Sequence, residues 1–383
     1  MTLKGRELWM AVHRYTGLVI LIFLGFAALT GSALVMMDGI DKALNADLFR
    51  QAAVAHPAAV PEAVDRFRTD HPEFTVASFP LAVPADARIP VKVEAAHGVD
   101  QVFLDRASGA LSGMRSSEAA FTRRGGARLL HDVHYTLMLG DYGRWFMGLM
   151  ALAWLASNLV GFYLTLPPRG PFWKQWKRTW QVKRGSAFPR QMMDLHRASG
   201  LWLILPLTLL ALTSVCMNFF KEGYSPVVDW LVPERELVLP KSGASASLTF
   251  ASAVTKARTI AGKMGEGWRP ATVLYETEDN RIGVTLTDNG QLNYHWLGPI
   301  YLYFDARTGQ VAETHDPYHG NGKLAAYRLL YPIHSGRIAG LPTLAIVFVS
   351  GLVIFGMCVT GVYLWWKKRP SRKGRRAAPR NAA

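Results

Sequence analysis

Four histidines stand in two matching sequence frames beside long apolar segments. His13 opens the frame His-Arg-Tyr-Thr-Gly-Leu, and His196 opens the similar frame His-Arg-Ala-Ser-Gly-Leu. His134 and His334 are each followed, 27 positions later, by a Gly-x-Tyr triplet. Imidazole is a common metal ligand, and a histidine near lipid needs a partner for its polar ring. Two pairs at matching positions therefore predict two bis-histidine metal sites, most simply two haems.

The positions of these histidines along the chain predict how they pair. Two axial ligands approach a flat macrocycle from opposite faces, so equivalent residues of two repeats suit the two positions. We expect His13 and His196 to hold an inner haem, and His134 and His334 to hold an outer haem. An iron with two axial imidazoles has no open coordination position. The chemistry predicted for both haems is therefore electron transfer, not oxygen binding.

Two other interpretations of these histidines remain open. His131 shares a helix face with His134 at spacing i, i+3, so it is an alternative outer ligand. Its counterpart in the second frame is Tyr331, which breaks the symmetry. Any single histidine at a membrane boundary can also be an interfacial residue bonded to water or headgroups. The repetition of the frames favours the ligand interpretation for the set.

Arginines accompany both histidine pairs. Arg14 and Arg197 directly follow the inner histidines, and Arg144 and Arg337 lie near the outer ones. A guanidinium forms bidentate hydrogen bonds with carboxylates, so these arginines can bind haem propionates. They can equally be ordinary arginines that extend toward lipid headgroups. We predict Arg14, Arg197 and Arg337 as cofactor-binding residues.

Four segments contain no charged residue over membrane-spanning lengths. A helix needs roughly 20 residues to cross about 30 Å of hydrocarbon, and buried core helices rarely stay free of charge for so long. The first segment is longer than the apolar core of a signal peptide, so we expect it to remain as an uncleaved anchor. The predicted transmembrane helices cover residues 15–37, 145–168, 198–220 and 338–366.

The net charge of +15 is concentrated in three short stretches. Residues 1–14, 167–190 and 367–383 together hold 18 of the 43 Lys and Arg residues but only one of the 28 acidic residues. An excess of basic residues marks the cytoplasmic side of a membrane protein. Both termini are therefore predicted inside, with two long segments between the spans outside. The charge is explained by the membrane and gives no support for nucleic-acid binding.

The two halves of the chain are similar at a constant spacing. Residues 103–109 match residues 303–309, and the offset of 200 is the one that separates His134 from His334. In the outer segments, apolar periodicity predicts a helix followed by strands in each half. The first set is a helix at 60–68 with strands at 74–83, 89–95 and 102–104. The second set is a helix at 248–264 with strands at 271–276, 281–287 and 300–304.

The predicted fold is an integral membrane α-helical protein, with a four-helix transmembrane bundle from an internal duplication and two outer α+β domains. Repeats of the same orientation should be related by an axis along the membrane normal. A short interfacial helix is expected before the second and the fourth span. The predicted boundaries are 1–37 for the N-terminus and first span, 38–126 for the first outer domain, 127–168 for an interfacial helix and the second span, 169–194 for a basic cytoplasmic loop, 195–220 for the third span, 221–322 for the second outer domain, 323–366 for an interfacial helix and the fourth span, and 367–383 for a basic cytoplasmic tail.

Several motifs are absent, which narrows the chemistry. Cys216 and Cys358 do not form a Cys-x-x-Cys-His motif, so the haems are predicted to be of the non-covalent b type. The sequence has no Gly-x-Gly-x-x-Gly after a strand and no phosphate-binding loop. Electrons are therefore expected from a separate cytoplasmic donor or from a membrane quinol.

The paired His-Arg-x-[Thr/Ser]-Gly-Leu frames, the His334-Ser335-Gly336-Arg337 turn and the Gly-x-Tyr endings resemble the PepSY-associated transmembrane helix family. The resemblance covers residues 6–369, and the architecture is similar to the ferrioxamine-type siderophore reductases of bacterial inner membranes. It implies two PepSY-like outer domains in the periplasm and two b haems. It also implies reduction of Fe(III) to Fe(II) in a ferric hydroxamate siderophore, for iron uptake. His134 lacks the Ser-Gly-Arg sequence that follows His334, so the motif is weaker there.

The resulting prediction is a haem-dependent ferric-siderophore reductase of the inner membrane. One electron lowers the charge of Fe(III) and weakens its bonds to hard anionic oxygens, so the chelator need not be destroyed. Two alternatives remain. One is a quinol-linked electron-transfer subunit for another periplasmic partner, and the other is a non-enzymatic PepSY-type binding or assembly module.

Overall fold

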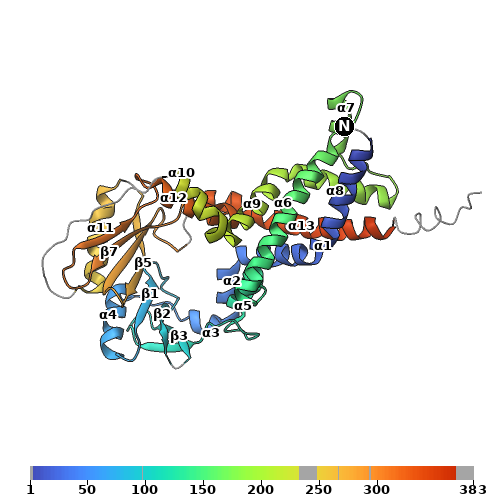
Figure 1. Cartoon of the computed structure of the whole chain (residues 1–383). Helices are drawn as coiled ribbons and strands as arrows, with labels where there is room; N and C mark the ends of the chain where they lie inside the picture. Colours follow the sequence, from blue (N-terminus) through green and yellow to red (C-terminus); the bar gives the residue numbers. More distant parts are fainter. Residues whose placement is uncertain (1–2, 97, 233–247, 266, 293–294, 368–383) are drawn as a thin grey trace, which may run out of the picture. The chain divides into compact units, whose positions relative to one another are not determined.

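The computed structural model describes residues 3–96, 98–232, 248–265, 267–292 and 295–367 (Figure 1). The chain divides into two compact units. The membrane-helix unit takes in residues 1–35, 133–220 and 342–383, and the sheet unit takes in residues 36–132 and 221–341. Apart from Lys367, the predicted cytoplasmic tail lies outside the described residues.

Among the described residues of the membrane-helix unit, three helices are long and apolar enough to cross a membrane. They are α1 (Leu3–Val35), α6 (Gly140–Thr165) and α13 (Leu341–Lys367). Their candidate spans, Gly5–Val35, Gly140–Thr165 and Leu341–Lys367, cover most of three of the predicted segments. Each helix extends beyond its charge-free segment into polar sequence. A helix can continue there because its backbone hydrogen bonds do not depend on contact with lipid.

The fourth predicted span is not a single straight helix. Residues 198–220 belong to α8 (Phe188–Trp202) and α9 (Ile204–Asn218), which meet at an angle of 71°. Pro206 accounts for the break, because its ring lacks an N–H and crowds the carbonyl of Trp202 four residues earlier. The matching position in α1 is Phe23, and α1 continues unbroken there. Short helix α7 (Phe172–Thr179) forms within the predicted basic loop.

The helices of this unit pack closely at small residues. α6 packs against both α1 and α9, and the bundle has a core of Ala28, Leu207 and Ile354. α1 and α13 cross at Gly351, where an added Cβ would lie 2.1 Å from Ser32 Oγ. Only glycine allows this approach, as is common where membrane helices meet.

The sheet unit contains one eight-stranded antiparallel sheet in the order β4-β3-β2-β1-β5-β6-β7-β8. Its first half is α4 (Val60–Asp70), β1 (Val76–Pro80), β2 (Ile89–Ala96), β3 (Val99–Leu104) and β4 (Leu111–Arg115). Its second half is α11 (Phe250–Lys263), β5 (Arg269–Glu276), β6 (Arg281–Thr287), β7 (Ile300–Asp305) and β8 (Val311–His315).

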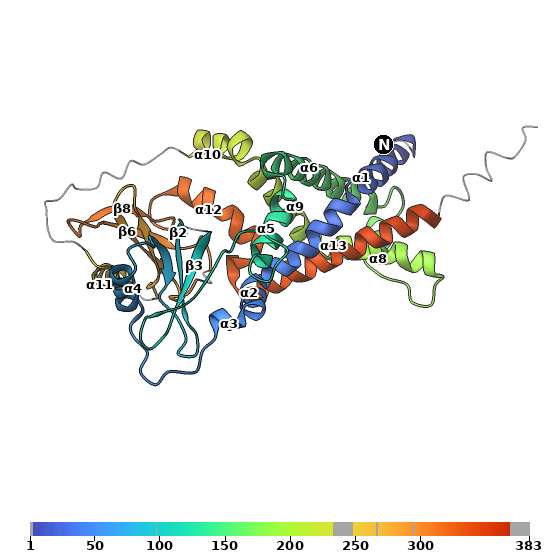
Figure 2. The same cartoon turned by 90° about the horizontal axis from the view of Figure 1, so that it is seen from below.

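The two predicted outer domains are thus joined in a single sheet. β1 and β5 pair antiparallel at its centre through Ser78–Leu274, Phe79–Val273 and Pro80–Thr272. This pairing removes one exposed edge from each half, which would otherwise present unpaired backbone groups to solvent. α4 and α11 lie side by side on one face of the sheet (Figure 2).

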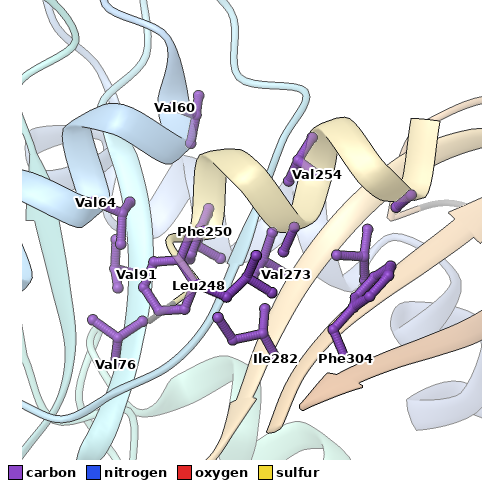
Figure 3. Close-up of a cluster of buried hydrophobic side chains, with 14 of the residues drawn as sticks. Val60, Val64, Val76, Val91, Leu248, Phe250, Val254, Val273, Ile282 and Phe304 are labelled. Carbon is purple, nitrogen blue, oxygen red and sulfur yellow. The ribbon is translucent and has the colours of Figure 1, made fainter. Parts of the chain in front are cut away.

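One hydrophobic core serves both halves of the sheet unit. Val60 and Val64 of α4 pack with Phe250 and Val254 of α11 above the strands (Figure 3). The strands contribute Val76, Val91, Val273, Ile282 and Phe304 to the same cluster. A shared core buries more apolar surface per residue than two separate small ones, which favours the joined sheet.

Shorter helices connect these elements. They are α2 (Met37–Leu44), α3 (Ala46–Phe49), α5 (Gly126–Thr136), a π-helical turn η1 (Phe220–Tyr224), α10 (Ser225–Leu231), α12 (Gly322–Ser335) and a 3-10 turn η2 (Arg337–Ala339). α5 and α12 occupy the positions predicted for helices before the second and fourth spans. Gly336 ends α12 with a φ of +79°, a conformation that glycine adopts without strain.

The Asp-x-x-Ser/Thr-Gly turns after β3 and β7 should give the sheet unit a pH-dependent stability. Asp105 accepts hydrogen bonds from the N–H groups of Ala107 and Ser108, and Asp305 accepts them from those of Arg307 and Thr308. These bonds, foremost those from the residue three positions on, lower the pKa of both carboxyls. The stabilisation is therefore present above about pH 4 and is lost as the pH falls through the lower folded-state pKa.

We expect the melting temperature of D105N and D305N to depend less on pH below about pH 4 than that of the unaltered protein. The matched control is Asp70→Asn, at an exposed carboxyl that ends α4. Equal pH dependence in all four proteins would show that the turns do not contribute.

Candidate functional site

The membrane-helix unit brings His13 of α1 and His196 of α8 together. Their ring centres are 6.4 Å apart and the ring planes are 74° apart. A metal–imidazole bond is about 2.0–2.1 Å, and each bonding nitrogen lies about 1.1 Å from its ring centre, so two imidazoles on opposite sides of one metal have ring centres about 6.3 Å apart. The separation of the two rings therefore fits a shared metal ion.

Hydrogen bonds at Nδ1 orient both rings. His13 Nδ1 lies 3.0 Å from the hydroxyl oxygen of Ser157 and 3.1 Å from its carbonyl oxygen. A hydroxyl can donate or accept but a carbonyl can only accept, so the carbonyl contact assigns the proton to this nitrogen. His196 Nδ1 lies 3.0 Å from Thr360 Oγ1, whose own hydrogen is donated to the carbonyl of Met357. Both rings then present the lone pair of Nε2. A fixed tautomer of this kind is characteristic of histidines that bind metals.

The two rings line a cavity of about 460 Å³ enclosed by α1, α6, α8, α9 and α13. Its wall is mainly apolar and includes four glycines, Gly17, Gly161, Gly200 and Gly361. A Cβ added at Gly17 would meet no atom within 4 Å. Glycines around an apolar slot of this size allow a flat ring to approach the helix backbones, so the cavity fits a porphyrin.

Arg14 and Arg197 also line this cavity. Arg197 donates to Asp194 at 3.0 Å, while its buried Nε has no hydrogen-bond partner among the residues that the structure describes. Asp194 is only 1% exposed and also binds Arg190. A carboxylate of a bound group would satisfy Arg197 Nε, as expected for a haem propionate.

His134 contacts α1 within the same unit. Its Nδ1 lies 3.0 Å from Thr30 Oγ1, which donates its own hydrogen to the carbonyl of Phe26. Nδ1 of His134 therefore carries the proton, as it does in His13 and His196. Its ring also lies against Gly31, where an added Cβ would be 3.0 Å from Cε1.

His131, the alternative outer ligand, is placed differently. Its Nδ1 pairs with Asp132 at 2.9 Å, and its side chain is 47% exposed. A half-exposed ring that pairs with a neighbouring carboxylate on the same helix is an ordinary surface arrangement. The placement of the two residues favours His134 over His131 as a ligand.

His334 and Arg337 belong to the sheet unit. His334 is a half-buried residue of the last turn of α12, and Arg337 begins η2 directly after Gly336. Because His134 and His334 lie in different units, the pairing of these two histidines stays a prediction.

Sequence reasoning missed the residues that hold the histidines. Ser157, Thr360 and Thr30 have no fixed spacing from the histidines that they contact, so no motif identifies them. Asp194, which was also missed, holds Arg197. Asp194 had one usable signal, because it is a lone carboxylate beside a basic loop and an apolar run.

The replacement of Gly161 by alanine should disturb His13, whereas the same change at Gly361 should leave His196 in place. An added Cβ would lie 3.1 Å from His13 Cε1 at Gly161, but 3.8 Å from His196 Cε1 at Gly361. The first distance forces the ring to move and the second is an ordinary contact. If the cavity holds a haem, G161A should shift its low-spin electron paramagnetic resonance signal and weaken haem retention about tenfold. Identical spectra of G161A and G361A would contradict this expectation.

The helices and the sheet define a class: an integral membrane protein whose helical membrane part is combined with a sheet domain. The chain belongs to the family described as the PepSY-associated TM region, which matches residues 10–368. A comparison with curated proteins gave no match.

Proposed function

We propose that this protein is a di-haem b oxidoreductase of the bacterial inner membrane, which passes electrons outward to a ferric siderophore. The observation that carries the proposal is the pairing of His13 and His196, 6.4 Å apart, in a glycine-lined cavity. Family membership supports a protein with a membrane-spanning helical part, but it does not identify the substrate.

The side chains around the cavity have separate roles in this proposal. His13 and His196 would hold the haem iron, and Ser157 and Thr360 keep their rings in the required tautomer. Arg197, with Arg14, binds the propionates. When bound, the haem supplies a one-electron carrier with no open coordination position.

The outer half of the proposal rests on His134 and His334. Thr30 and Gly31 hold His134 on α1, and the offset of 200 assigns His334 as its partner in a duplicated four-helix frame. The excess of Lys and Arg in the basic loop and termini supports a cytoplasmic location for the His13 side and a periplasmic location for the sheet unit. A cytoplasmic protein or quinol donates the electron, and the Fe(III) of a hydroxamate siderophore accepts it and becomes Fe(II).

The test is a visible spectrum of the purified full-length protein, followed by a reaction. We expect reversible b-type absorption with about two haems per chain. The prereduced protein should then be reoxidised by a ferric hydroxamate, with Fe(II) trapped by a chelator. A protein that stays colourless after haem supplementation would contradict the haem sites. A two-haem protein that ignores the ferric hydroxamate would instead be an electron-transfer subunit for another partner.

A further inference from the structure

Helix α7 has two chemically different faces. One face carries Trp176, and the other carries Lys174, Lys177 and Arg178, which are all exposed. The three cations share a face because they follow the spacing i, i+3, i+4 of a helix. No acidic residue occurs between residues 167 and 190, so no neighbour in the loop neutralises this face.

The inner face of α7 contacts the wall of the haem cavity. Trp176 Nε1 donates to Thr165 Oγ1 at 3.4 Å, and its ring packs edge-on against Phe162. Phe162 and Thr165 both line the cavity. Trp202 of α8 donates to the carbonyl of Trp180, which follows α7. The helix is thus attached both to α6 and to the helix that bears His196.

The aromatic residues of α7 extend from these contacts to the surface. Phe172, Trp173, Trp176 and Trp180 form a continuous cluster with ring centres 5.2–5.7 Å apart. Trp173 is 73% exposed although it is large and apolar. α7 begins seven residues after the membrane-spanning helix α6 ends. A short basic helix with exposed tryptophan, so near the end of a span, has the composition of an element in the membrane interface.

We infer that the face of α7 formed by Trp173, Lys174, Lys177 and Arg178 binds the headgroups of anionic phospholipids. Lysine ammonium groups and the arginine bind phosphate, and Trp173 enters the interface beside them. The bound lipid holds α7 in place, and α7 in turn holds Trp176 against Phe162 and Thr165. An acidic soluble protein is a less suitable partner, because it offers no apolar layer for Trp173.

The first experiment measures which lipids stay with the protein. Full-length protein is reconstituted in nanodiscs with equal phosphatidylglycerol and phosphatidylcholine, released in mild detergent, and its bound lipids are counted by native mass spectrometry. We expect phosphatidylglycerol to be enriched. The variant K174Q/K177Q/R178Q should reduce this enrichment on the order of tenfold.

The matched control is the variant R169Q/K183Q/R184Q. It removes three exposed cations from the same loop but none from α7. Enrichment that falls equally in both variants would show a non-specific effect of net charge and overturn the inference, as would a wild-type protein with no preference. Neither measurement requires haem, so failure here is distinguishable from failure of the proposed function.

The second experiment tests the link to the cavity wall by hydrogen exchange. Trp176→Ala should speed amide exchange in the last turn of α6, residues 162–165, because it removes the packing on Phe162 and Thr165. Trp173→Ala, at the exposed face, should leave exchange in that turn unchanged. Equal amide exchange in both variants would overturn the inference that α7 stabilises the cavity wall through Trp176.

Discussion

If the protein carries the two b-type haems that we propose, replacement of His196 by alanine is expected to leave one haem per chain. The ring of His196 is one of two imidazoles whose centres are 6.4 Å apart, and Thr360 fixes its Nε2 as the ligand atom. A methyl group offers no ligand, and a single remaining imidazole holds haem far less tightly than two. The haem-to-protein ratio and a redox titration measure the result. One of two potentiometric steps should disappear.

Two controls make this result specific. His131→Ala should retain both haems, because His131 is half exposed and paired with Asp132. His13→Ala should remove the same potentiometric step as His196→Ala, because both rings belong to one site. Size-exclusion chromatography and circular dichroism identify any variant that has failed to fold. Retention of both haems in a folded H196A protein would refute the pairing.

The inner histidine pair could be predicted because the two frames repeat almost residue for residue. A repeat shows which residues are equivalent, and equivalent residues of two similar halves come together around a common axis. The residues that orient the rings could not be predicted in this way. Thr360 and Ser157 stand on other helices, and serine and threonine in a membrane helix usually bond to their own backbone. Only the packing of α6 and α13 brings them to the imidazoles.

The break between α8 and α9 was predictable in principle. Pro206 lies within the apolar run 198–220, and proline inside a helix removes a hydrogen bond and crowds the preceding turn. The prediction of a single span rested on length and absence of charge. Neither criterion takes account of a proline within the helix. Because the matching residue in α1 is Phe23, the two halves differ at the very place where their sequences otherwise correspond.

Strands β1–β3 and β5–β7 were predicted from the alternation of apolar residues, but β4, β8 and the sheet as a whole were not. β4 and β8 have only partly buried, mixed sequences, so their periodicity is weak. The central pairing of β1 with β5 joins segments almost 200 residues apart. Pairing at such a distance depends on the removal of two exposed edges and on a shared core, neither of which is a local property of the sequence.

Replacement of Arg115 by alanine is expected to lower the free energy of unfolding of the sheet unit by about 3–5 kcal/mol. Arg115 forms a bidentate pair with Asp41 at 2.7 and 2.8 Å and donates to Gln101. The side chains of Arg115 and Asp41 are only 6% and 16% exposed. Alanine would leave the Asp41 carboxylate in a poorly hydrated place without its cation. Pulse proteolysis of the full chain in detergent, across a urea series, measures the change.

The exposed ion pair between Arg123 and Asp47 supplies the matched control. Their side chains are 56% and 45% exposed, and such pairs contribute about 0–1 kcal/mol. Arg123→Ala should therefore have a small effect, and a similar small effect of Arg115→Ala would contradict the argument. The double variant R115M/D41L separates the two possible origins of the loss. It removes the stranded charge as well as its partner, so it should recover much of the stability lost in R115A if the cost comes from the buried carboxylate. If the double variant is no more stable than R115A, the lost stability comes instead from the packing of Arg115 over Phe49 and Phe103.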